Sequence, residues 1–208
     1  MIRVSSLIVV LLLAGASPRP AAPGRTLALW YRQPAATWTE ALPVGNGRLG
    51  AMVFGGVASE RIQLNEDSVW AGEKRDRNNP EGARSLAEVR RLLREGRPRE
   101  AEALADKTII SVPRRLPPYQ PLGDLRLRFT GHDDAGDYAR ELDLETGIVR
   151  VSYRAGAARY TREVFSSAAD QVIVVRLAGD RAGGLSFAAT LGREEDARAR
   201  VVAPDRVA

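Results

Sequence analysis

The sequence of 208 residues contains no cysteine, two lysines and a single histidine. Without cysteine there is neither a disulfide framework nor a thiolate zinc site, so packing alone must hold the fold. No serine stands in a nucleophile elbow, which leaves Ser-His-Asp and Cys-His hydrolases without support. Tryptophan is also scarce, because the chain has only three, all within its first 70 residues. Few rings are therefore available for a sugar-stacking surface.

The one histidine, His132, lies in the segment GHDDAGD. Two neighbouring aspartates suggest a metal site, but one turn rarely supplies enough ligands in the right geometry, and the same composition suits a hairpin turn. The glycines of GNGRLG do not form a dinucleotide fingerprint, because we expect a strand rather than a helix after them. We therefore expect no metal and no cofactor.

Positive charge is not gathered into one block. The 31 basic residues exceed the 26 acidic ones, for a formal charge of +5. Between positions 81 and 100, where arginine is densest, glutamates are interleaved with the arginines. This spacing favours a solvated, ion-paired helix face, so we expect no nucleic-acid partner.

The first residues predict an export signal. Arg3 precedes an apolar run at 7–13, and the small residues at 14–16 suit a cleavage site. The run is shorter than the ~20 residues that span a bilayer, so a cleaved signal peptide is favoured over a membrane anchor. We predict a signal peptide at 1–16, a proline-rich linker at 17–25 and a mature domain at 26–208. The product is expected to be periplasmic or extracellular, with no membrane attachment after cleavage.

The chain is organised around residues 40–56, EALPVGNGRLGAMVFGG. Gly45, Gly47 and Gly50 permit backbone conformations and close approaches that other residues resist, so a tight turn carrying Asn46 and Arg48 is expected to open a strand. The glycines at 55 and 56 end that strand. A second strand follows through Ile62 and Leu64, which gives a hairpin. Its exit delivers Asn65, Glu66, Asp67 and Trp70 into one loop.

Helical and strand patterns divide the rest of the chain. Asn79 and Pro80 suit the start of a helix with Leu86, Val89 and Leu93 on one face, and Pro98 suits the start of a second helix. After a proline-rich crossing at 112–123, short alternating segments and turns continue to residue 191. They predict a mainly β fold, an antiparallel β-sandwich with a helical insertion around residues 80–110. Trp30 and Tyr31 are predicted to belong to its core.

The central motifs, with NNPEGARSLAEVRRLLREGR at 78–97, YQPLGDLRL at 119–127 and YARELDLETGIVRVSY at 138–153, resemble the N-terminal domain of glycoside hydrolase family 95. That family comprises α-L-fucosidases and related α-L-galactosidases. The resemblance covers nearly all of the chain after the first two dozen residues, with VWAG at 69–72 where the family more often has LWSG. It implies that the catalytic (α/α)6 barrel lies outside these residues and that the substrate is a fucosylated or galactosylated glycan.

Glycosidases need two carboxyl groups that flank the scissile bond, ~6.5 to 9.5 Å apart in inverting enzymes. Adjacent carboxylates such as Glu66 and Asp67 cannot flank a sugar by themselves. The resemblance likewise implies an inverting hydrolase whose acid and water-activating residues belong to the barrel, so we expect no catalytic residue in this chain. Asn65, Glu66, Asp67 and Trp70 are candidates for a substrate rim. A structural alternative has equal weight: Asn65 and Asp67 cap a turn, and Trp70 packs between domains.

Two functions from different classes therefore compete. In the first, the chain is the exported N-terminal portion of a fucosidase-type hydrolase and is inert without its barrel. In the second, it is a free-standing carbohydrate-binding or structural sandwich. The second needs an exposed aromatic platform, and the scarcity of tryptophan favours the first.

Overall fold

The computed structural model describes residues 9–13, 27–181, 184–195, 197–203 and 206–207. The predicted linker and most of the predicted signal peptide lie outside the described residues. The chain divides into two compact units. One consists of the residues up to Val69 and from Pro121 onward, and the other of Trp70–Gln120.

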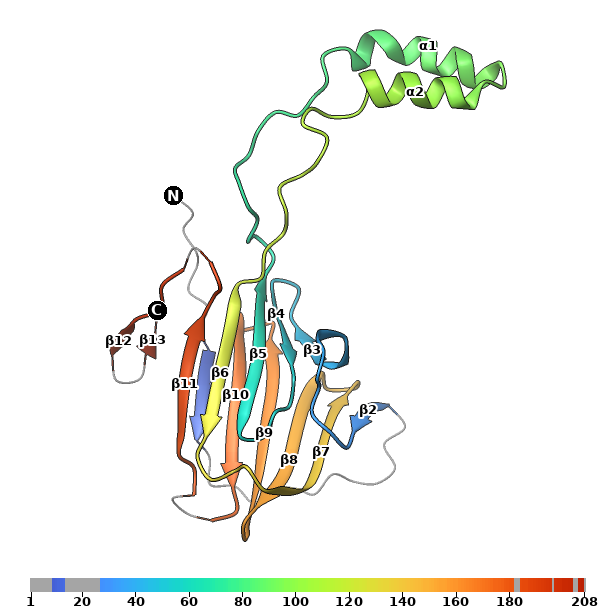
Figure 1. Ribbon diagram of the computed structural model, residues 1–208. Helices are drawn as coiled ribbons and strands as arrows, with labels where there is room; N and C mark the ends of the chain where they lie inside the picture. The colour runs from blue at the N-terminus through green and yellow to red at the C-terminus, as the bar shows by residue number, and fades with distance from the viewer. Residues whose placement is uncertain (1–8, 14–26, 182–183, 196, 204–205, 208) are drawn as a thin grey trace. The chain divides into compact units, whose positions relative to one another are not determined.

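The first unit is a sandwich of two sheets (Figure 1). Sheet A has six strands in the spatial order β1 (Val9–Leu13), β10 (Val172–Gly179), β9 (Ala158–Ser167), β8 (Ile148–Ala155), β7 (Ala135–Asp143) and β2 (Ala28–Tyr31). Sheet B has five, in the order β11 (Phe187–Gly192), β6 (Gly123–Phe129), β5 (Ser59–Glu66), β4 (Leu49–Val53) and β3 (Leu42–Gly45). A short 3-10 helix, η1 (Trp38–Glu40), precedes β3, and β12 (Val201–Ala203) pairs with β13 (Arg206–Val207).

Neighbouring strands in both sheets are antiparallel except β1 and β10, which are parallel. Strands β7 to β10 form a meander, as the closely spaced strand pattern predicted. The predicted antiparallel sandwich is therefore confirmed. The core lies between the sheets, because alternate side chains of each strand point to the same face: Ile62 and Leu64 of β5 are fully buried, whereas Arg61 and Gln63 are half-buried.

The prediction that Trp30 and Tyr31 belong to the core is wrong, because these side chains are 63% and 39% exposed. Their strand, β2, is an edge strand of sheet A. The edge strand of the opposite sheet, β3, packs over β7, β8 and β9. The strand pattern predicted β2 correctly, but it does not say how far the facing sheet extends over Tyr31, and Trp30 lies on the outer face of sheet A, opposite Glu141 of β7.

Strand β1 consists of residues from the predicted apolar run of the signal peptide. It lies at the other edge of sheet A, where it pairs with β10. Cleavage after residue 16 would remove β1 and leave β10 as the edge. The signal peptide itself stays a prediction.

The second unit contains α1 (Gly82–Arg94) and α2 (Pro98–Thr108), so the helical insertion around 80–110 is confirmed. Helix α1 begins later than predicted, because Asn79 forms a turn in which its Oδ1 accepts the Glu81 N–H at 3.0 Å. Its buried stripe also differs from the predicted one. Val89 and Leu92 pack on Ala101 of α2, whereas Leu86 and Leu93 are exposed.

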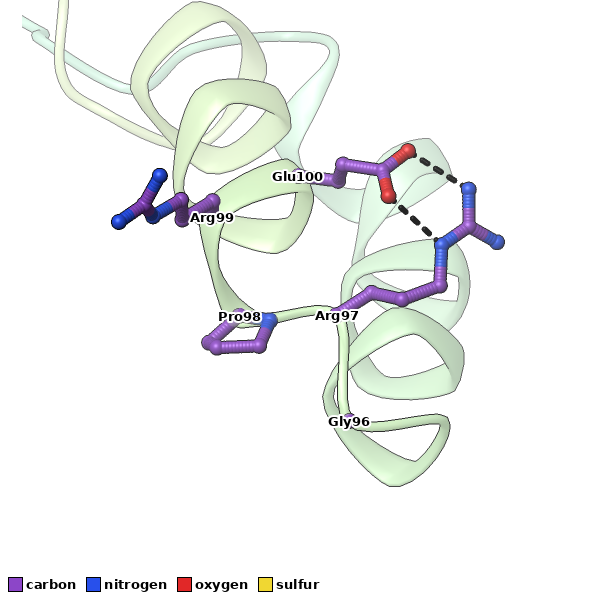
Figure 2. Close-up of a pocket in the computed structure, with 5 residues that line it drawn as sticks. All are labelled: Gly96, Arg97, Pro98, Arg99 and Glu100. Atoms are coloured by element: carbon purple, nitrogen blue, oxygen red, sulfur yellow. Dashed lines mark hydrogen bonds and ion pairs between the residues drawn. The ribbon is translucent and has the colours of Figure 1, made fainter.

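The arginine-rich face of these helices is ion-paired, as predicted. The Arg91 guanidinium contacts both Glu88 and Glu95, each at 2.5 Å. Figure 2 shows the pocket at the turn between the helices, where Arg97 and Glu100 pair at 2.6 Å. Arg97 and Glu100 thus neutralise each other, whereas Arg99, which also lines the pocket, is exposed and takes no part in this pair. No helix in the described part of the chain is long and apolar enough to span a bilayer.

Candidate functional site

The turn between β3 and β4 is built by its asparagine and one glycine. The Asn46 Oδ1 atom accepts the N–H groups of Arg48 and Leu49 at 3.1 and 2.8 Å. Gly47 has φ of 96°, which a residue with a side chain rarely adopts. The Asn46 amide also donates to the Ser167 carbonyl at 2.8 Å, at the end of β9. The predicted turn is confirmed, and Asn46 ties it to the opposite sheet.

The other two glycines of the motif lie opposite each other in the sheet. Gly45 pairs with Gly50, and Gly50 pairs with Asn65. A Cβ atom on Gly50 would lie 3.7 Å from the Cβ of Asn65, an ordinary contact, whereas one on Gly45 would lie 3.3 Å from a carbonyl oxygen of Leu49. Backbone conformation therefore requires glycine only at 47 in this turn.

Arg48 joins the turn to two other segments. Its Nε atom donates to the Gln171 Oε1 at 2.8 Å, and its Nη2 to the Gln171 carbonyl at 3.2 Å. Its Nη1 contacts the Glu66 Oε1 at 3.3 Å. Gln171 stands just before β10 and Glu66 ends β5. One guanidinium therefore links the two sheets at this end of the sandwich.

Glu66 is a buried hydrogen-bond acceptor. Its Oε2 accepts the Ser68 hydroxyl at 2.6 Å and the Ser68 N–H at 3.0 Å. The hydroxyl of Ser68 is the main cause that lowers the pKa of Glu66, with further help from the Ser68 N–H and the Arg48 guanidinium. At neutral pH this side chain is therefore ionised, and it cannot serve as a proton donor.

The four residues predicted for the substrate rim are not all on one face. Strand alternation puts Glu66 toward the core and Asn65, half-buried beside Gly50, on the outer face of sheet B. Asp67 is exposed, and its N–H donates to the Arg48 carbonyl at 3.0 Å. Trp70 belongs to the second unit, where its ring meets that of Tyr119 edge to face at 5.0 Å.

A buried ion pair lies elsewhere in the sandwich, between Glu60 of β5 and Arg162 of β9. The Glu60 Oε1 atom accepts the Gly55 and Arg61 N–H groups at 2.8 and 3.0 Å. The pair was not predicted as a feature of the fold. The sequence contains a signal for the burial of Arg162, because this residue alternates with Tyr160 and Val164 along β9 and therefore points inward.

His132 belongs to the aromatic core rather than to a ligand site. Its Nδ1 lies 2.9 Å from the Tyr153 hydroxyl, and its ring packs on Phe129 and Tyr160. Burial lowers the pKa of His132, with a further contribution from the Arg162 charge, and burial raises the pKa of Tyr153 to about 12. Within the residues that the structure describes, no three His, Asp or Glu side chains are grouped so as to hold a metal ion.

Comparison with known proteins identifies the sandwich. Residues 29–207 match the model of the glycosyl hydrolase family 65 N-terminal domain. The chain is 42% identical to alpha-L-fucosidase 2 of Arabidopsis thaliana over 173 residues, which are 82% of this chain and 20% of that protein. It is 32% identical to the probable alpha-fucosidase A of Aspergillus oryzae over 154 residues, 72% of this chain and 21% of that protein.

A second Aspergillus protein, the probable alpha-fucosidase A of Aspergillus niger, is 30% identical over 149 residues, 68% of this chain and 18% of that protein. The chain thus spans about one fifth of the length of the curated relatives that it matches. These relatives bear out the resemblance to the N-terminal domain of an α-L-fucosidase-type glycoside hydrolase. With nearly its whole described length matched, the chain belongs to the family of glycosyl hydrolase family 65 N-terminal domains.

Proposed function

We propose that this chain is the N-terminal, non-catalytic portion of an exported enzyme that hydrolyses terminal α-L-fucosyl or α-L-galactosyl linkages with inversion. The observation that carries the proposal is the similarity to three fucosidases, of which the chain spans about one fifth. The catalytic barrel would supply the general acid and the water-activating residue. The partners of this domain are then that barrel and the glycan.

Within such an enzyme, the proposed task of the polar end of the sandwich is to hold and rim the active site. The ionised Glu66, which Arg48 contacts, accepts two hydrogen bonds from Ser68. These bonds fix the segment that follows β5. In the sandwich unit Asp67 is exposed beyond this anchor, and in the second unit Trp70 is 46% exposed. An exposed carboxylate and an indole suit binding of sugar hydroxyls and stacking on a sugar ring, without proton transfer.

The test of the non-catalytic assignment is direct. The purified 208-residue chain and the full-length enzyme are incubated with 2′-fucosyllactose and with an aryl α-L-fucoside. We expect fucose release by the full-length enzyme and none above a blank by the chain. Release by the chain, lost in Asp67→Asn, would move the catalytic site onto this domain.

One observation favours the free-standing carbohydrate-binding alternative. Trp30 and Trp38 are 63% and 56% exposed, so rings are available to stack on a sugar. Calorimetric titration of the purified chain with fucosylated oligosaccharides tests it. Binding that is lost in Trp30→Ala or Trp38→Ala would favour the alternative, and the absence of binding favours the enzyme portion.

Export is the remaining part of the proposal. It depends on the apolar run at 7–13 and the small residues at 14–16. N-terminal sequencing of protein produced in its native host should give a mature chain that begins near residue 17. A product that retains Met1 in the cytoplasm would contradict it.

A further inference from the structure

The inner face of sheet A extends beyond the cover that sheet B provides. Five side chains in register form a row across this face, from Val175 of β10 through Val164, Val149 and Leu142 to Leu29 of β2. The first four are at most 6% exposed, whereas Leu29 is 44% exposed. The row that forms the core thus ends on an uncovered leucine.

Leu29 is one of four neighbouring apolar side chains at this edge. Leu27 and Tyr31 stand two positions away along the chain and share its face. Leu144 lies beside Leu27, because its N–H donates to the Leu27 carbonyl at 3.0 Å. We call these four residues the β2 strip, and each of them is exposed. Figure 1 shows β2 at the edge of its sheet, beside β7.

The outer face of the same strands is chemically different. The neighbouring row carries Glu141, Arg150, Glu163 and Arg176 on four successive strands. Each is ion-paired to the next, at 3.0, 2.8 and 2.8 Å. Across β7 to β10 this face is adapted to water, and its row ends on the exposed Trp30 of β2. The β2 strip offers no charge and only one hydroxyl.

We propose that the β2 strip is an intramolecular docking surface, covered by an apolar segment of the same enzyme from outside residues 1–208. The inference rests on the proposed function, because it requires the chain to be part of a longer enzyme. The relatives are about five times as long as the region that they share with this chain, so most of such a polypeptide is available to provide the cover. Continuity with the buried row predicts that the segment extends the core.

The composition of the β2 strip decides against a sugar as the occupant. Three of the four side chains are leucines, which lack both a flat ring for stacking and a group that hydrogen-bonds a hydroxyl. Leucines suit an aliphatic helix or strand face, where burial contributes about 25 cal/mol per Å² of apolar surface. Large apolar patches of this kind are seldom left open to water.

Photo-cross-linking in the full-length enzyme tests the proposal. The photoreactive residue p-benzoylphenylalanine replaces Leu29 in one variant and Leu93, which is 55% exposed on α1, in a matched control. We expect Leu29 to give an intramolecular cross-link to a peptide outside residues 1–208, at least tenfold more than Leu93 gives to that peptide. A cross-link to residues 1–26, a cross-link between two molecules, or none would overturn the proposal.

A second measurement needs no substitution at the strip. In hydroxyl-radical footprinting of the unmodified full-length enzyme, Leu29 and Tyr31 should be labelled several-fold more slowly than exposed residues of their type, whereas Leu93 should be labelled freely. Equal labelling of Leu29 and Leu93 would overturn the proposal even if the cross-linking variant failed to fold. Neither readout depends on hydrolysis. An enzyme inactive on fucosides that still shows the cross-link would therefore contradict the proposed activity and leave the docking surface intact.

Discussion

Arg162 of β9 and Glu60 of β5 form an ion pair between the two sheets, with side chains that are 2% and 0% exposed. The Arg162 guanidinium also donates to the Gly56 carbonyl at 2.9 Å and lies 4.8 Å from the centre of the Phe129 ring. The pair thus fastens both sheets to the loop between β4 and β5. Core side chains rather than solvent surround the pair, so each charge is stabilised by the other instead of by water.

Removal of one partner should destabilise the sandwich strongly. Glu60→Gln leaves the Arg162 charge buried without its counterion, and breaking a buried pair in this way costs about 3 to 5 kcal/mol. Urea denaturation of the chain measures the loss. Adding Arg162→Met to Glu60→Gln should restore part of the stability, because no charge is then left buried. Glu100→Gln, which breaks an exposed pair in α2, is the control and should leave the denaturation midpoint almost unchanged.

The loop that this pair fastens also depends on a glycine. A Cβ atom on Gly56 would lie 2.0 Å from the backbone oxygen of Ser59, whereas one on Gly192 would meet nothing within 4 Å. Gly56→Ala must therefore displace backbone, and we expect it to lower the free energy of unfolding by about 3 kcal/mol or more. Gly192→Ala is the matched control and should be almost neutral. Similar denaturation midpoints for the two variants would show that the loop adapts to the added methyl group.

Stability should fall on mild acidification because of His132. Burial lowers the pKa of this imidazole below its ordinary value of 6.5. Between the pKa values that the imidazole has in the folded and in the unfolded chain, the unfolded chain binds more protons. The stability that His132 contributes is therefore full above pH 6.5 and declines as the pH falls below it. The slope is at most about 1.4 kcal/mol per pH unit for one group.

Chemical denaturation of the chain at several pH values between 7.5 and about 5 measures this slope. Burial raises the pKa of Glu60, but this residue is present in every variant compared, so the difference in slope between variants reports on His132. In His132→Phe the slope over this range should decrease, although the variant also loses the bond to the Tyr153 hydroxyl. Tyr153→Phe removes that bond and keeps the histidine, so it serves as the control. An unchanged slope in His132→Phe would assign the effect to other groups.

In the full-length enzyme, Trp70→Ala should weaken substrate binding. An interaction made equally in the ground and transition states raises KM and leaves kcat nearly unchanged. We expect kcat/KM to fall roughly tenfold, which corresponds to about 1.4 kcal/mol. Steady-state kinetics on an aryl α-L-fucoside measure the change, with Leu93→Ala, a residue 55% exposed on α1, as the control. If Trp70→Ala instead lowers the melting temperature and spares the kinetics, its ring has a packing role.

Much of the fold was determined by the sequence alone. The alternation of apolar and polar residues along a strand is a local property of the sequence, so it predicted most strands of the sandwich. The positions of proline and glycine predicted the two-helix insertion. The turn at Asn46 and Gly47 was equally local, because an asparagine and a glycine supply its hydrogen bonds and its positive φ. The resemblance to a glycoside hydrolase N-terminal domain also came from motifs in the sequence.

Only the tertiary structure decided which side chains are covered and which partners they find. Trp30 and Tyr31 were predicted as core, but Trp30 lies on the outer face of sheet A opposite Glu141, and Tyr31 lies on an edge strand that the facing sheet does not cover. Asn65 and Glu66 were predicted to lie in one loop, yet β5 includes both, and Arg48 and Ser68 hold the Glu66 carboxylate on the inner side. Glu60 and Arg162 are about a hundred residues apart, and the packing of sheet B against sheet A brings them together. Such pairings depend on where distant segments meet, which no local pattern of residues encodes.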